Sequence, residues 1–210
     1  MDQENGGNDD VNEASELEKA DIEAGKKLAR HRDEPAVKAG KIGDQGPLYA
    51  LSAGLLVFGI LKGDRRLAGS GIAMLAACGL ADLGKSVVKH LVSRTRPDVL
   101  LDEDRYETDA GGSEEKPEQS FPSGHTAGSV AVARALSRNY PFAGDAAGVA
   151  AVAIGVSRVV KGAHWPLDVA AGAVIGLATE AGSAELLELG ARSLTGTILE
   201  EQLPVFCTPE

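Results

Sequence analysis

The feature that most constrains this chain is a series of apolar runs separated by short charged segments. The longest run covers residues 67–88, and a shorter one covers residues 47–61. A helix needs about 17–25 mostly apolar residues to cross a bilayer, so the first is long enough and the second lies near the limit. Three further runs, rich in alanine and glycine, cover residues 126–137, 143–160 and 166–189. The pattern predicts an all-α, membrane-embedded bundle of about five apolar helices, in which small residues permit close packing. A soluble helical bundle is the alternative, because several runs are weak as isolated spans.

Polar segments flank and interrupt this predicted domain, which we place at residues 47–190. Residues 1–46 read as an acidic, solvated and disordered tail, within which residues 13–32 have the charge pattern of a polar helix. Residues 98–119 form an acidic insertion, which we expect to be mobile and exposed, as a lid or as a solvated loop. Residues 191–210 read as a polar C-terminal tail.

Composition excludes several classes of function. The formal net charge of −10 argues against binding to nucleic acid. Cys78 and Cys207 offer neither a disulfide framework nor the spacing of a metal site. The first ten residues are acidic and lack an apolar run, so no signal peptide is expected there.

A proline-led turn precedes the run at residues 126–137. Ser123 is placed to cap the helix, and Gly124 lets a ligand approach the first free N–H groups. His125 then lies in the first turn, where its imidazole can reach an anion held by those groups. A plain helix cap is the alternative for this stretch alone.

Two further groups of residues carry charge at predicted helix ends. Lys89 and Arg96 follow the run at residues 67–88 and can converge on one anion, or can serve as a basic interfacial patch. Arg158 precedes His164 and Asp168, whose spacing of four can bring a carboxylate against an imidazole on one face. A structural His–Asp cap is the alternative. Trp165 is expected to be a packing or interface anchor.

Together these groups supply three cations, a helix N-terminus and two histidines, one of them with a carboxylate. Cations and N–H groups stabilise phosphoryl oxygens, and two histidines can act as nucleophile and as proton donor. A metal site is disfavoured, because few carboxylates lie near the histidines and the cations would repel a metal ion. The residues therefore indicate phosphoryl transfer without a metal or cofactor.

The three motifs, in this order, resemble those of the type 2 phosphatidic acid phosphatases, the PAP2 or lipid phosphate phosphatase superfamily. The matching residues are Lys89, Arg96-Pro97, Pro122-Ser123-Gly124-His125 and Ser157-Arg158 with His164 and Asp168. The resemblance implies that His164 is the nucleophile, that Asp168 orients it and that His125 is the general acid. It implies that the phosphate is bound by Lys89, Arg96, Ser123, Gly124 and Arg158.

The resemblance therefore leads us to expect a metal-independent phosphatase of the cell (inner) membrane. Its substrate would be a lipid phosphomonoester or diphosphate, such as phosphatidate, phosphatidylglycerol phosphate or a polyprenyl (di)phosphate. The basic residues between the helices, at the end opposite the motifs, predict an active site that faces the outside or periplasm. The lysines and arginines at residues 26–41 of the otherwise acidic N-terminal tail oppose this orientation. The alternatives are a soluble-substrate acid phosphatase, a vanadium haloperoxidase of the same superfamily, or a non-catalytic lipid-binding membrane protein.

Overall fold

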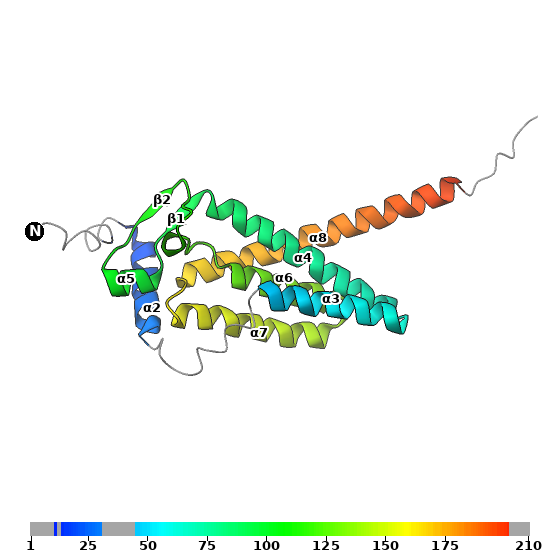
Figure 1. Cartoon of the computed structure of the whole chain (residues 1–210), viewed down its shortest axis with the longest axis horizontal. Coiled ribbons are helices and arrows are strands. Elements are labelled where there is room, and N and C mark those ends of the chain that lie inside the picture. The colour runs from blue at the N-terminus through cyan, green and yellow to red at the C-terminus, as the bar shows by residue number, and fades with distance from the viewer. Residues whose placement is uncertain (1–10, 12–13, 31–44, 202–210) are drawn as a thin grey trace, which may run out of the picture.

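The computed structural model describes residues 11, 14–30 and 45–201 and is almost entirely helical (Figure 1). Two short strands, β1 (Val92–Arg94) and β2 (Thr108–Ala110), form an antiparallel pair with Val92 opposite Ala110. The helices are α2 (Glu16–Ala29), α3 (Gln45–Lys62), α4 (Arg65–Lys89), α5 (Pro97–Glu103), the 3₁₀ turn η2 (Lys116–Glu118), α6 (Gly124–Asn139), α7 (Pro141–Val160) and α8 (Pro166–Glu201).

Helices α3, α4, α6, α7 and α8 run in alternating directions between the two ends of one bundle (Figure 1). The boundaries follow local chemistry: the Asp64 side chain accepts the Leu67 N–H at the start of α4, and Pro141 and Pro166 begin α7 and α8. Helix α6 lies at the centre and contacts α3, α4, α7 and α8. The bundle agrees with the predicted number of apolar helices.

In the described part of the chain, α3, α4, α7 and residues 166–193 of α8 are long and apolar enough to cross a membrane. Helix α6 has 16 residues and is shielded by its neighbours. The outer helix faces carry many exposed large apolar side chains, which suit lipid rather than water. They include Leu51, Val57, Phe58, Ile60, Leu83, Val149, Val152, Val174 and Leu177. The chain is therefore a membrane protein by its fold.

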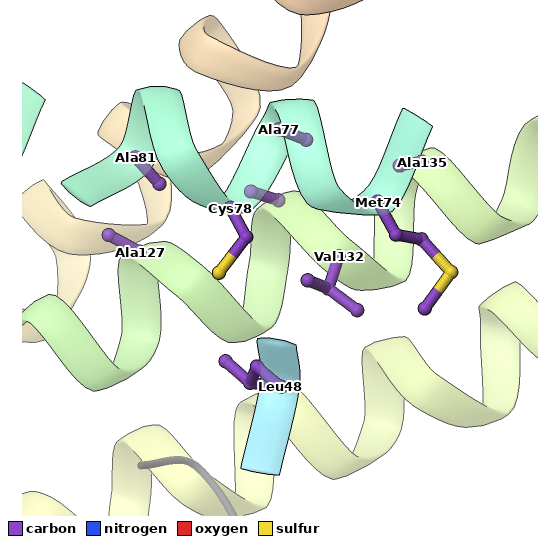
Figure 2. Packing of buried hydrophobic residues seen from close by; sticks show 9 residues of the cluster. Leu48, Met74, Ala77, Cys78, Ala81, Ala127, Val132 and Ala135 are labelled. Carbon is purple, nitrogen blue, oxygen red and sulfur yellow. The ribbon is translucent and has the colours of Figure 1, made fainter. Parts of the chain in front are cut away.

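The core of the bundle lies where α3, α4 and α6 meet (Figure 2). Its buried residues are mostly small, which lets the helices approach closely. They are Leu48, Met74, Ala77, Cys78, Ala81, Ala127, Ala131, Val132 and Ala135.

Glycines on α8 permit a still closer contact with α6. A Cβ atom at Gly172 would lie 2.4 Å from the Ser123 carbonyl oxygen, and one at Gly176 would lie 2.5 Å from that of Ala127. Real side chains do not tolerate such distances, so both positions require glycine. The contact fixes the start of α6 against the first turns of α8, where two of the sequence motifs lie.

A small cap covers the end of the bundle at which α4 ends and α6 begins (Figure 1). It consists of α2, the β1–β2 pair and α5, which share an apolar cluster of Ile22, Leu100, Tyr106 and Trp165. Trp165 is fully buried, its ring meets that of Tyr106 edge-on at 6.0 Å, and its Nε1 donates to the Thr95 carbonyl. The expectation that Trp165 is a packing anchor is therefore confirmed.

The cap corrects two predictions about the polar segments. Residues 98–119 contain α5, β2 and η2 rather than one continuous loop, and Tyr106 buries its ring among apolar neighbours, whereas all three residues of β2 are exposed as expected. The polar helix predicted within residues 13–32 is present as α2, but it packs by Ile22 into the cap rather than being solvated. Helix α8 also extends to Glu201, beyond the predicted end near residue 189. The rest of the predicted tails, residues 1–10, 12–13, 31–44 and 202–210, lies outside the described residues.

The close contact of α6 and α8 predicts opposite effects for two substitutions on one helix. Gly176→Ala would force a methyl group against the Ala127 carbonyl and should lower the melting temperature in detergent. Gly182→Ala meets no atom within 4 Å and should leave the melting temperature unchanged or raise it, because alanine favours helix by up to about 1 kcal/mol. Equal increases for both variants would contradict the packing described here.

Candidate active site

A cavity of about 370 Å³ opens at the capped end of the bundle. Six residues singled out from the sequence line it: Lys89, Arg96, Gly124, His125, Arg158 and His164. Lys85, Gln45 and Gly46 complete the lining, which contains no carboxylate among the described residues. The structure thus brings the three distant motifs together around one strongly cationic space.

Backbone carbonyls at the end of the insertion hold the first two cations. Lys89 Nζ donates to the Gln119 carbonyl at 2.9 Å, and Arg96 Nη2 lies 3.5 Å from the same oxygen. Arg96 Nε donates to the Lys116 carbonyl at 2.8 Å. These neutral acceptors orient the cations without cancelling their charges, so both remain able to attract an anion.

The same backbone segment orients His164. The Ser120 N–H donates to the Arg94 carbonyl, which fixes the segment beside β1. The Ser120 carbonyl in turn accepts a hydrogen bond of 2.7 Å from His164 Nδ1. Because a carbonyl only accepts, Nδ1 carries the proton, and Nε2 is the nitrogen left with a lone pair.

Burial controls the protonation of His164, whose side chain is 3% exposed. Desolvation lowers the pKa of this imidazole below its ordinary value, and the charge of Arg96 acts in the same direction. Asp168 and the Ser120 carbonyl oppose the shift without reversing it. The ring is therefore neutral at physiological pH, as a nitrogen nucleophile requires.

The turn before α8 delivers His164 to the cavity. Gly162 adopts a positive φ of 71°, which reverses the chain after α7. The N–H groups of Ala163 and His164 then donate to the Arg158 carbonyl, at 3.1 and 3.3 Å. The Arg158 side chain and the His164 ring consequently line the same cavity.

Asp168 lies behind His164 and is fully buried. Its Oδ2 lies 3.8 Å from His164 Nδ1, within ion-pair distance but beyond a hydrogen bond. That oxygen accepts hydrogen bonds from Ser120 Oγ and from the Trp165 N–H, the latter at 2.7 Å. The position of Asp168 agrees with the predicted pairing, but the Ser120 carbonyl takes the hydrogen bond expected of the carboxylate.

The start of α6 supplies His125 and Gly124. The ring centroids of His125 and His164 are 6.5 Å apart, and both residues line the cavity. Ser123 is the exception among the predicted ligands, because it is fully buried and does not line the cavity. Its side chain does not cap α6 as predicted; its Oγ accepts from Thr126 Oγ1 at 3.0 Å, and its N–H donates to the Asp168 carbonyl.

Three residues near the site were not predicted as site residues. Lys85 lines the cavity one helical turn before Lys89 and pairs with Asp82 at 2.8 Å, and the i, i+4 spacing of the two lysines was the available signal. Arg94 and Ser120 contact Asp168 from outside the cavity. No sequence spacing indicates those two contacts, because the chain folds back over many residues to make them.

Comparison with known proteins agrees with this geometry. Residues 70–187 match the profile of the PAP2 superfamily. Over 88 residues the chain is 38% identical to a non-specific acid phosphatase of Salmonella typhi, covering 42% of this chain and 35% of the relative. Over 120 residues it is 33% identical to phosphatidylglycerophosphatase B of Bacillus subtilis strain 168, covering 51% and 53%. The chain thus spans about half, or less, of these relatives.

Two solved structures share the fold. LpxE of Aquifex aeolicus superposes with a TM-score of 0.53 at 23% identity, over 78% of this chain and 94% of that one. A transmembrane PAP2-type phosphatidylglycerolphosphate phosphatase of Bacillus subtilis gives 0.51 at 24% identity, over 84% and 88%. The all-α, PAP2-like bundle predicted from the motifs is therefore confirmed. The profile match contains every cavity-lining residue named above except those at the start of α3, and the chain belongs to the PAP2 superfamily.

Proposed function

We propose that this protein is a phosphatase that hydrolyses a phosphomonoester or diphosphate on a lipid, through a phosphohistidine on His164. The observation that carries the proposal is a single cationic cavity that holds two histidines, one of them neutral and hydrogen-bonded through Nδ1. Such a cavity binds a phosphate and presents a nitrogen lone pair to it. The PAP2 family membership supports the same chemistry.

Charge in the cavity suits the transition state of phosphoryl transfer. Lys89, Arg96 and Arg158 supply positive charge and N–H donors to the phosphoryl oxygens, and the first turn of α6 adds backbone N–H groups at Gly124. These groups are held before substrate arrives, so little reorganisation is needed during the reaction. In this account cationic side chains perform the charge stabilisation that a metal ion performs in other phosphatases.

The two histidines then divide the chemistry. The Nε2 lone pair of His164 attacks phosphorus while the bond to the leaving oxygen breaks, and His125 donates its proton to that oxygen. The phosphorylated ring of His164 is cationic, and the carboxylate of Asp168 at 3.8 Å stabilises it. In the second step His125 takes a proton from water, the water oxygen attacks phosphorus, and His164 leaves as the neutral imidazole.

The surroundings of the cavity favour a substrate with a lipid tail. The cavity lies at the end of helices whose outer faces are apolar, so a phosphate head group can enter while acyl or prenyl chains stay in the bilayer. Names of relatives agree, since one acts on phosphatidylglycerophosphate. The relative named as a non-specific acid phosphatase makes a water-soluble phosphate ester the other substrate class to test.

Replacement of His164 and replacement of His125 should reduce phosphate release differently on lipid and aryl phosphates. His164→Ala removes the nucleophile and should reduce phosphate release to background on every substrate. His125→Ala removes the proton donor and should cost about 10²–10⁴-fold on a lipid phosphate, but much less on p-nitrophenyl phosphate, whose leaving group needs no proton. The measurement is phosphate release by detergent-purified protein, with a lipid panel and the aryl ester in parallel.

His90→Ala is the matched control for this pair, because His90 is exposed at the end of α4 and does not line the cavity. It should retain wild-type rates on both substrates. Substantial turnover by His164→Ala would contradict the proposed nucleophile, and equal losses for His125→Ala on both substrates would contradict the proposed acid.

We further infer that the cavity faces the outside of the cell membrane. Basic residues of the short connections lie at the opposite end of the bundle, as the positive-inside rule requires of the cytoplasmic side. They are Lys62, Arg65, Arg66 and Arg138, with the Arg66 guanidinium 4.6 Å from the centre of the Tyr140 ring. Basic residues on α2 lie at the cavity end and oppose this orientation.

Thiol labelling decides the orientation. In a Cys78→Ala, Cys207→Ser background, a membrane-impermeant maleimide should label Glu115→Cys, on the exposed cap, in intact cells. Lys62→Cys, at the other end of α3, should react only after lysis. The reverse pattern would place the cavity inside the cell.

A further inference from the structure

A buried bridge of three charged side chains links the N-terminal helix to the active site. Arg94 Nη1 lies 3.0 Å from Asp168 Oδ1, and Arg94 Nη2 lies 2.9 Å from Asp21 Oδ2 on α2. Asp21 and Arg94 are each 5% exposed, and Asp168 is fully buried. Neither Asp21 nor Arg94 is one of the residues of the three sequence motifs, and the profile match begins well after α2.

We propose that Asp21 is a positioning residue for catalysis, which acts through Arg94 to keep the charge of Asp168 effective at His164. Helix α2 would then contribute to catalysis through Asp21, rather than only extending the chain. The inference rests on the proposed function, since it concerns the histidine proposed as nucleophile.

The effect of Asp21 on His164 follows from the summed charge of Asp21, Arg94 and Asp168. Arg94 and Asp168 alone would form a neutral pair, whose field at His164 would largely cancel. Asp21 adds a second carboxyl group on the far side of the same guanidinium, and with Asp21 ionised the group of three carries a net charge of −1. Burial raises the pKa of Asp21, while the Leu167 N–H and the charge of Arg94 act to lower it. Burial also makes this difference in net charge felt at His164, because solvent screens it little.

The contacts around the bridge hold Asp21 in one place. Asp21 Oδ1 accepts the Leu167 N–H at 2.8 Å, which ties α2 directly to the first turn of α8. Arg94 Nε donates to Tyr106 Oη at 3.1 Å, so each of its nitrogens meets a different partner. A Cβ at Gly25 would lie 2.4 Å from the Trp165 ring, so α2 approaches this end of the bundle as closely as its backbone permits.

Stability alone gives a weak reason for such a bridge. Removing ions from water carries a large cost in free energy, and apolar residues of similar volume commonly stabilise a protein as well or better. An apolar α2 could seal the cap with Ile22 and its neighbours. A carboxylate placed on the far side of the guanidinium that holds Asp168 is better explained by its effect on the reaction.

Several charged or titratable groups face His164, and the test must separate Asp21 from them. Asp168 approaches from α8, Arg94 from β1, Arg96 from the start of α5, His125 from α6, Arg158 from α7, Lys85 and Lys89 from α4, and Asp21 from α2 through Arg94. Arg94 and Asp21 both lie outside the cavity and are not motif residues, but Arg94 contacts Asp168 directly, whereas Asp21 contacts Arg94. Replacement of Asp21 therefore changes the field without removing a group that touches substrate.

The decisive variant is Asp21→Asn in the full chain. The cationic, phosphorylated ring of His164 loses stabilisation, so kcat should fall about tenfold with KM unchanged, which corresponds to one pKa unit of interaction. Loss of negative charge also lowers the pKa of His164 further, so the acid limb of kcat should move to lower pH. Glu23→Gln makes the same charge change on the exposed face of α2 and should alter neither quantity.

An NMR titration and the variant Asp21→Glu separate the effect of the Asp21 charge from loss of folding or of turnover. NMR titration of the His164 ring, assigned with His164→Ala, should show the same downward shift in Asp21→Asn without any need for turnover. Asp21→Glu retains the charge and should keep the wild-type acid limb, even if Asp21→Asn does not fold. A wild-type protein that releases no phosphate would defeat the proposed function, while the titration would still decide the role of Asp21.

A lowered melting temperature with an unchanged kcat, acid limb and His164 titration would overturn the inference, because Asp21 would then only fasten α2. A shifted acid limb in Asp21→Glu would overturn it as well, since that variant keeps the charge. Equal effects of Asp21→Asn and Glu23→Gln on kcat and its acid limb would also overturn the inference, because both variants would then act through a general change in the charge of the protein.

Discussion

The buried carboxylate of Asp168 joins the segments that surround the active site. A charge without solvent must be fully satisfied, and Asp168 is satisfied by Ser120, the Trp165 N–H and Arg94. These partners come from the end of the insertion, the turn before α8 and strand β1. The need to satisfy one carboxylate therefore assembles segments that lie far apart in the sequence, and the cavity forms on the side that faces His164.

The bundle supplies the rigid frame for this assembly. Small residues let α6 approach α8 so closely that the Ser123 and Ala127 carbonyls leave no space for a side chain at Gly172 and Gly176. His125 and His164 are consequently fixed near each other in the lining of one cavity. The apolar outer faces suit contact with lipid, while the cationic cavity lies at the capped end of the bundle.

The sequence predicts the bundle and most of the cavity because both depend on local patterns. Apolar runs indicate the helices, and six of the eight predicted site residues line one cavity. Asp168 lies directly behind it, whereas Ser123 does not act as a cap. The contacts made by Arg94 and the burial of Asp21 could not be predicted from the sequence. They depend on how α2, β1 and α8 pack against one another, and sequence periodicity does not indicate such long-range contacts. The same reason explains why α2 and residues 98–119 read as polar and solvated although they pack together around Tyr106 and Trp165.

The most direct test of the account is to trap the enzyme after the first chemical step. Wild-type protein mixed with ³²P-labelled lipid phosphate and quenched in base should carry an acid-labile, base-stable label, and mass spectrometry should place it on the peptide that contains His164. The account predicts label at His164 alone. Label on another residue, or rapid turnover with no labelled protein at any time, would contradict a phosphohistidine at this position.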